Sequence, residues 1–273
     1  MTDSNATIVK RYLGWIVLGF MLAIIGVLVF FSARHTQPSA PTTQIDVSED
    51  SNLENAPSTV PDAIVDAPVT IEPEPTEPLP TLEESDATLL PLLENNLPPT
   101  ILERHLVRED IITKFVITVD NLDRSKVALD KRVFKAIPGE PFVLEKGDRI
   151  MLSEDNFLRY DNVVRALDTT NLEQLVALYV RHYPLFQQAY EQLGYPDEQF
   201  HSRLVQVLDH LLLPIALSQE PVELLRPKSL YEFRDPSLES LSAGQKMLIR
   251  MGEQNATISR KKLAELRRLI AAN

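Results

Sequence analysis

An uncharged run of 22 residues separates the pair Lys10 and Arg11 from Arg34, and it constrains this chain more than any other feature. Residues 12–31 of the run are almost entirely apolar, and thirteen of these 20 residues are Leu, Ile, Val or Phe. At about 1.5 Å per residue, a helix of this length is roughly 30 Å long, which matches the hydrocarbon core of a bilayer. The run therefore predicts a transmembrane helix over residues 12–31.

A cleavable signal peptide is the main alternative, and two features disfavour it. Signal peptides have a shorter apolar core of about 7 to 15 residues, followed by a cleavage site with small side chains. Here the apolar run is longer, and it ends in the large side chains of Phe30 and Phe31. We therefore expect the span to be retained as a membrane anchor.

The flanking charges predict the orientation of the span. Lys10 and Arg11 come directly before it, whereas Arg34 is the only Lys or Arg that follows it closely. Lys and Arg next to a span favour the cytoplasmic side. We therefore expect residues 1–11 to form a cytoplasmic tail and the long downstream part to lie on the other side of the membrane.

Gly19, Ala23 and Gly26 fall on one stripe of the predicted span. Small residues in such a stripe let two membrane helices approach closely, so one interpretation is a homodimer formed through the span. The other interpretation is that Gly and Ala are simply common in membrane helices. Pull-down of differently tagged copies of the chain distinguishes the two.

The composition changes sharply after the span. Residues 32–100 contain 12 of the 20 prolines and 13 acidic residues, against one arginine and no lysine or glycine. The segment therefore carries a net charge of −12, as does the whole chain. The acidic side chains of such a segment repel one another, and its apolar residues are too few to form a core. This composition predicts an extended, disordered linker over residues 32–81. The alternative is an acidic tail that binds a basic partner.

Residues 101–273 carry a net charge of only −1, and residues 82–273 are long enough for one domain with a single core. Their hydrophobic spacing is mostly helical, and short extended runs at residues 142–152, 222–225 and 230–233 predict two small β-ribbons. The fold class expected here is therefore mainly α with minor β. The expected helices are a short one capped by Ser85 or Asp86, residues 154–167, one opened by Asn171, residues 184–194, residues 196–211, one opened by Asp235 and Pro236, residues 242–252 and residues 258–270.

Several classes of chemistry are disfavoured by the sequence. The chain has no cysteine, which excludes disulfides, thiol catalysis and thiolate metal sites. It has no glycine-rich phosphate loop, G-x-S-x-G turn or H-E-x-x-H pair. His201 and His210 are nine positions apart, which places them on opposite faces of a helix. We therefore expect no metal, no cofactor and, because the domain is not basic, no nucleic acid.

Polar aromatic and charged residues are the candidates for a binding surface. Tyrosine and arginine combine a broad contact area with a hydrogen-bonding group. An aspartate in a mostly apolar helix predicts a partly buried carboxylate with a partner, for instance Asp209 with Arg226. The alternative is that most of the tyrosines belong to the core. The candidate residues are Tyr160, Asp161, Tyr179, Tyr183, Asp209, Arg226 and Tyr231.

The last predicted helix carries a basic face made by Arg260, Lys261, Lys262, Arg267 and Arg268. A solvated helix face is the simple interpretation of this pattern. Contact with an anionic envelope polymer or lipid is the alternative.

Five short stretches carry a family resemblance: residues 117–122 (ITVDNL), 178–184 (LY with HYP), 193–196 (LGYP), 207–211 (VLDHL) and 241–252 (LSAGQKMLIRMG). In this order they resemble a bacterial family, the domain-of-unknown-function family 3014, and the resemblance extends over residues 82–270. It implies an uncharacterised proteobacterial protein of the inner membrane whose domain faces the periplasm. It implies no activity.

Three functions fit these patterns. The first is a non-enzymatic domain, tethered to the membrane, that binds an envelope protein or polymer. The second is an envelope hydrolase or transferase that uses carboxylates and tyrosines, Asp161 and Asp209 among them. The third is a structural subunit of an inner-membrane complex. A deep pocket with a converging carboxylate favours the enzyme, whereas a shallower groove favours the binding domain.

Overall fold

The structure is a computed structural model that describes residues 78–125, 131–215, 221–227 and 230–272. The predicted span, most of the predicted linker and the stripe of Gly19, Ala23 and Gly26 lie outside these residues. Among the helices within the described residues, none is both long and apolar enough to cross a membrane.

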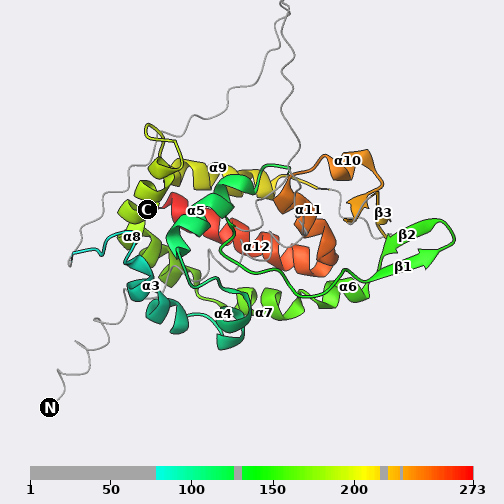
Figure 1. Cartoon of the computed structure of the whole chain (residues 1–273), viewed down its shortest axis with the longest axis horizontal. Helices are drawn as coiled ribbons and strands as arrows, with labels where there is room; N and C mark the ends of the chain where they lie inside the picture. The colour runs from blue at the N-terminus through cyan, green and yellow to red at the C-terminus, as the bar shows by residue number, and fades with distance from the viewer. Residues whose placement is uncertain (1–77, 126–130, 216–220, 228–229, 273) are drawn as a thin grey trace, which may run out of the picture.

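The described part is mainly helical, with one small antiparallel sheet, which confirms the expected fold class at this level (Figure 1). The helices are α3 (Ser85–Glu94), α4 (Pro99–His105), α5 (Ile111–Asn121), α6 (Asp155–Leu158), α7 (Asp161–Thr169), α8 (Leu172–Gln192), α9 (Phe200–Leu212), α10 (Pro236–Glu239), α11 (Ala243–Arg250) and α12 (Gly252–Ala271). The strands are β1 (Val143–Lys146), β2 (Arg149–Leu152), β3 (Glu223–Leu225) and β4 (Glu232–Phe233).

Helix α12 lies at the centre of the helical body and contacts α7, α8, α9 and α11 (Figure 1). Its buried residues, among them Ala256, Leu263, Leu266 and Ile270, recur every three to four positions and so form one inward stripe. The expected helix over residues 258–270 is therefore present but begins earlier. It starts at Gly252, whose φ of +81° turns the chain out of α11.

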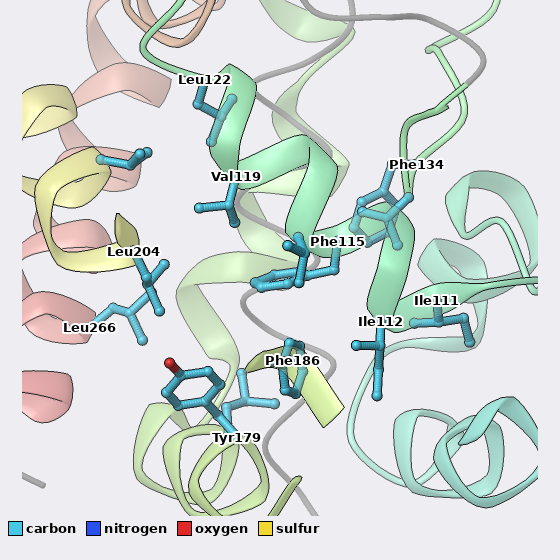
Figure 2. Packing of buried hydrophobic residues seen from close by; sticks show 14 of the residues in the cluster. Ile111, Ile112, Phe115, Val119, Leu122, Phe134, Tyr179, Phe186, Leu204 and Leu266 are labelled. Carbon is cyan, nitrogen blue, oxygen red and sulfur yellow. The ribbon is translucent and has the colours of Figure 1, made fainter. Parts of the chain in front are cut away.

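An aromatic group contributed by α5, α8 and α9 lies in the core, and Figure 2 shows its members Phe115, Phe186 and Tyr179. The ring of Phe115 meets those of Phe186 and Phe200 edge-on, with centroids 5.4 and 6.1 Å away. The Tyr179 ring lies 5.3 Å from Phe186. Such edge-to-face pairs stabilise the fold beyond the apolar area that they bury. The helical spacing of α5 was not recognised in the sequence, although this helix supplies the middle of the core.

Two buried histidines border this aromatic group, and they make the stability of the domain depend on pH. His201 Nδ1 lies 3.4 Å from the hydroxyl of Tyr179, and His182 Nδ1 lies 3.0 Å from the carbonyl of Leu178. Burial lowers the pKa of both imidazoles from the ordinary 6.5, with smaller contributions from the charges of Arg181 and Arg267.

We expect the free energy of unfolding to fall as the pH is lowered below about 6.5. In that range the two histidines take up protons more readily in the unfolded chain than in the folded one, so protonation favours the unfolded state. Urea unfolding between pH 7.5 and 5.5 measures the effect. The double variant His182→Gln and His201→Gln should show a shallower decline, and an unchanged slope would contradict the assignment to these two imidazoles.

Three of the predicted helix caps are confirmed, and the cap expected from Ser85 or Asp86 is wrong. The side chains of Asn171 and Ser242 accept hydrogen bonds from backbone N–H groups in the first turn of α8 and α11, and Asp235 does so in α10. Asp86 does not cap its own helix. Its carboxylate instead accepts from the N–H groups of Asp110 and Ile111, at 2.6 and 2.9 Å, and thereby caps α5 from a distance.

Three expected helix boundaries differ from the structure. The helix expected over residues 154–167 is divided into α6 and α7, with a turn at Arg159 and Tyr160. Pro184 does not begin a helix, because α8 runs through it from Leu172 to Gln192. Helix α9 begins at Phe200 rather than at residue 196, after a short turn.

The two expected ribbons are present, and they join into one sheet in the order β1-β2-β3-β4. The junction is the antiparallel pairing of β2 with β3, where Ile150 opposes Leu224. A small second core of Leu152, Leu224, Tyr231, Phe233 and Ile249 attaches the sheet to α11. The β1-β2 hairpin projects from the helical body (Figure 1).

Candidate functional site

The seven candidate residues lie in several places. Tyr160 and Tyr179 are fully buried, and Tyr183 is buried with its hydroxyl donating to Gln187 Oε1 at 3.0 Å. Tyr179 and Tyr183 contact each other edge-on, with ring centroids 5.7 Å apart. Burial raises the pKa of each of these three phenols. These tyrosines belong to the packed interior rather than to an accessible surface.

Arg226 and Tyr231 are brought together beside the sheet. The Arg226 guanidinium lies 4.9 Å from the centre of the Tyr231 ring and donates to its hydroxyl at 3.2 Å. The same guanidinium reaches Glu140 at 3.4 Å. The suggested pairing of Arg226 with Asp209 is therefore wrong.

Asp209 is exposed and pairs with Arg267, which donates to its two carboxylate oxygens at 2.8 and 3.1 Å. Asp161 accepts a hydrogen bond from Asn255 Nδ2 at 3.0 Å. Asn255 and Arg267 are 12 positions apart on α12, which is roughly 18 Å along a helix. The two carboxylates proposed for an enzyme are therefore held near opposite ends of α12.

The expected basic face of α12 is largely used in structural contacts. The Arg260 guanidinium donates to the carbonyls of Leu211, Leu212 and Leu213 and so caps the end of α9. Arg267 holds Asp209, and Lys262 pairs with Glu265 at 3.2 Å. Lys261 and Arg268 are the members of this set that are exposed.

A groove of about 850 Å³ lies between α4 and α7, closed on one side by the loop around Pro138, and we call it the Arg groove. Three arginines line it together with His105: Arg104 from α4, Arg159 from the turn before α7, and Arg165 from the middle of α7. None of its lining residues is Asp or Glu. Its apolar lining consists of Pro98, Ile101, Ile137, Pro138, Val163 and Ala166, and its remaining polar residues are Asn162 and Thr169.

The three arginines are held differently. Arg159 is half-buried and donates to the carbonyls of Pro138 and Gly139, at 3.2 and 2.9 Å, which fixes it against the loop. Arg165 is exposed and donates to Asn162 Oδ1 at 3.1 Å. Arg104 is exposed in the last turn of α4. In the part of the chain that the structure describes, neither Arg104 nor Arg165 forms an ion pair with a carboxylate.

The electrostatic environment of the groove is positive. Burial lowers the pKa of His105, and the nearby charges of Arg104 and Lys135 lower it further. Arg104 and Lys135 disfavour a further positive charge at His105, and no carboxylate among the lining residues offsets the three arginines. The groove is therefore a place where an anion is favoured.

The groove was not found in the sequence, and the reason is its construction. Its arginines lie at positions 104, 159 and 165, in segments that only the fold brings together. No local spacing connects them, so nothing in the sequence indicates that they share a site. In the described residues, no three His, Asp or Glu side chains are arranged to hold a metal ion.

Comparison with known proteins gives one match. The family model described as a protein of unknown function (DUF3014) matches residues 111–267, most of the region in which the resemblance was seen. No curated protein and no solved structure matches the chain. The chain belongs to the DUF3014 family.

Proposed function

We propose that this protein is a non-enzymatic binding domain held at the bacterial inner membrane, and that the Arg groove binds its partner in the cell envelope. The observation that carries the proposal is the lining of the groove, which combines three arginines and an apolar wall without a carboxylate. Concave sites with an apolar lining and a few placed polar groups are typical of ligand binding.

The same lining supports binding rather than catalysis. Hydrolysis or group transfer by carboxylates requires an acid and a base that converge on the reacting atoms. Asp161 and Asp209 are bound to distant parts of α12. His105 is the groove residue that titrates nearest to neutral pH, and no carboxylate lines the groove to orient it.

The membrane part of the proposal rests on the sequence. Residues 12–31 have the length and composition of a single span, and Lys10 and Arg11 favour a cytoplasmic N-terminal tail. The acidic, proline-rich residues 32–81 then act as the tether of a periplasmic domain. A coil of about 50 residues averages roughly 40 Å from end to end, so the domain stays within reach of the membrane.

The absence of cysteine from the chain allows a direct test with single introduced cysteines. Thr169→Cys places a thiol at the rim of the Arg groove, and Gln206→Cys places one on the exposed face of α9, away from the groove. We expect a membrane-impermeant maleimide to label both variants of the full chain in spheroplasts. A thiol-linked benzophenone should then crosslink an envelope component from position 169 but not from position 206.

Two further variants tie the crosslink to the groove. Adding Arg104→Glu and Arg165→Glu to the Thr169→Cys chain should abolish the adduct, because the two exposed arginines of the groove, which form no ion pair within the described residues, are then reversed. A chain containing only residues 1–81 and a terminal cysteine controls for capture by the tether. Lack of labelling would refute the periplasmic location, and equal adducts from both positions would refute the groove as the binding site.

A further inference from the structure

The Arg groove has two chemically distinct walls. Arg104 at the end of α4 and Arg165 in α7 form the cationic wall. Ile101 and Val163, which are buried, form the apolar wall together with Ala166. A ligand that matches both walls needs an anionic group and an apolar body in one molecule. A free inorganic anion matches only the first wall.

The arginines suit a phosphate head group. The guanidinium group is planar, remains charged at all physiological pH values and donates two parallel hydrogen bonds to phosphate or carboxylate oxygens. Arg104 and Arg165 carry no ion pair within the described residues, so a ligand displaces no carboxylate when it binds. Arg159 is already fixed on the carbonyls of Pro138 and Gly139 and adds positive potential without having to be ordered.

A peptide fits the groove less well than an alkyl chain does. The backbone groups of α4 and α7 are bonded within their helices, so they offer no strand edge to an extended peptide. Asn162 already accepts from Arg165, and the Thr169 hydroxyl already donates to carbonyls of its own helix. Arg104 and Arg165 can donate to the C=O groups of a docked peptide, but its N–H groups would lose water and find few acceptors on these helices, whereas an alkyl chain has no such groups.

We propose that the Arg groove binds a phosphate-headed amphiphile, with the phosphate between Arg104 and Arg165 and an alkyl chain along Ile101, Val163 and Ala166. The source is an anionic phospholipid of the membrane to which the chain is tethered. This inference rests on the proposed function, because it specifies the ligand of the same groove. Its volume of about 850 Å³ lies within the range of sites that hold small ligands.

The test compares three soluble probes on the full chain in nanodiscs of phosphatidylcholine, by isothermal titration calorimetry against empty nanodiscs. The probes are hexyl phosphate, inorganic phosphate and hexyltrimethylammonium. One buried CH₂ group is worth about a fourfold gain in affinity, so hexyl phosphate should bind at least about tenfold more tightly than inorganic phosphate. Hexyltrimethylammonium has the same alkyl chain and the opposite charge, and it should not bind.

Variants assign the binding to the two walls. Arg104→Glu with Arg165→Glu should weaken hexyl phosphate binding at least tenfold, whereas Arg268→Glu on the exposed face of α12 should change it less than twofold. Ala166→Leu fills the apolar wall and should weaken hexyl phosphate more than inorganic phosphate. Equal thermal unfolding midpoints for these variants show that each remains folded, since the two reversed arginines form no ion pair in the described structure.

Replacing a third of the phosphatidylcholine by phosphatidylglycerol should weaken hexyl phosphate binding by competition, which identifies membrane lipid as the source. The inference is overturned if hexyl phosphate binds no more tightly than inorganic phosphate, if the cationic probe binds equally, or if phosphatidylglycerol does not compete. If none of these probes binds while position 169 crosslinks an envelope protein, the lipid assignment fails and the proposed binding function stands. If position 169 also crosslinks nothing, both fail.

Discussion

Arg203→Met should lower the free energy of unfolding by about 3 kcal/mol, because it breaks a charge network that is largely buried. Arg203 donates to Asp120 Oδ1 at 2.9 Å, to the Asp120 carbonyl at 2.7 Å and to both carboxylate oxygens of Asp123 at 2.7 Å. The Asp120 side chain is only 7% exposed. After the guanidinium is removed, the Asp120 carboxylate still pairs with Arg124 at 2.6 Å. The expected loss of stability is therefore at the lower end of the range for broken buried ion pairs.

Arg203 also remains charged under all conditions in which the domain is folded. Burial alone would lower its pKa, but the hydrogen bonds and charges of Asp123 and Asp120 outweigh burial and raise the pKa above its ordinary value. The network joins the end of α5 to the start of α9. Its loss should therefore separate two helices whose aromatic residues meet in the core.

A matched control uses the same substitution at an exposed pair. Arg267→Met removes an arginine that also donates to both oxygens of one carboxylate, but Asp209 is 53% exposed and the loss should stay below about 1 kcal/mol. Urea unfolding of both variants measures the difference. Equal losses would show that burial of the Asp120 network adds nothing to the free energy of unfolding, which would contradict the prediction.

Gly252→Ala should destabilise the domain by about 3 kcal/mol, from two additive causes. Gly252 has a φ of +81°, a conformation that is unfavourable for any residue with a Cβ atom. A Cβ atom placed there would lie 2.5 to 2.9 Å from three ring carbons of Phe157, so the ring or the helix must move. Thermal or urea unfolding measures the loss.

Gly194→Ala separates the two causes. Gly194 has a φ of +106°, but no atom lies within 4 Å of the position of its Cβ, so this variant should lose only about 1 to 2 kcal/mol from backbone strain. Adding Phe157→Leu to Gly252→Ala should recover part of the difference by removing the ring. If the two alanine variants lose equal stability, contact with Phe157 is not a cause.

The sequence predicted the elements whose causes are local. Asn171 and Ser242 were identified as helix starts because a cap bonds to N–H groups two or three residues ahead. The hairpin around Gly147 was identified for the same reason, since its turn and its alternating residues lie in one short segment. Asp86 was misassigned because its partners are 24 and 25 positions away.

The candidate site depends on contacts between residues that are far apart in the sequence, as the cap formed by Asp86 does. The tyrosines had been proposed as a recognition surface, and Tyr160 and Tyr179 proved to be interior residues, because a phenol ring is suited to both places and sequence spacing does not separate them. Arg104 and Arg165 carry no signal individually, since exposed arginines are common. Only their common position in a groove without carboxylates distinguishes them.

The central position of α12 has a consequence for how this domain reaches its folded state. The helices α7, α8, α9 and α11 all precede α12 in the sequence, yet each packs against it. A chain that stops before Gly252 therefore leaves uncovered the apolar residues that these helices turn toward α12, although α5, α8 and α9 still meet through Phe115, Phe186 and Phe200. During synthesis these residues stay exposed to water until α12 has been made, so we expect the stable fold to require the chain through Ala271 rather than to form stepwise along it.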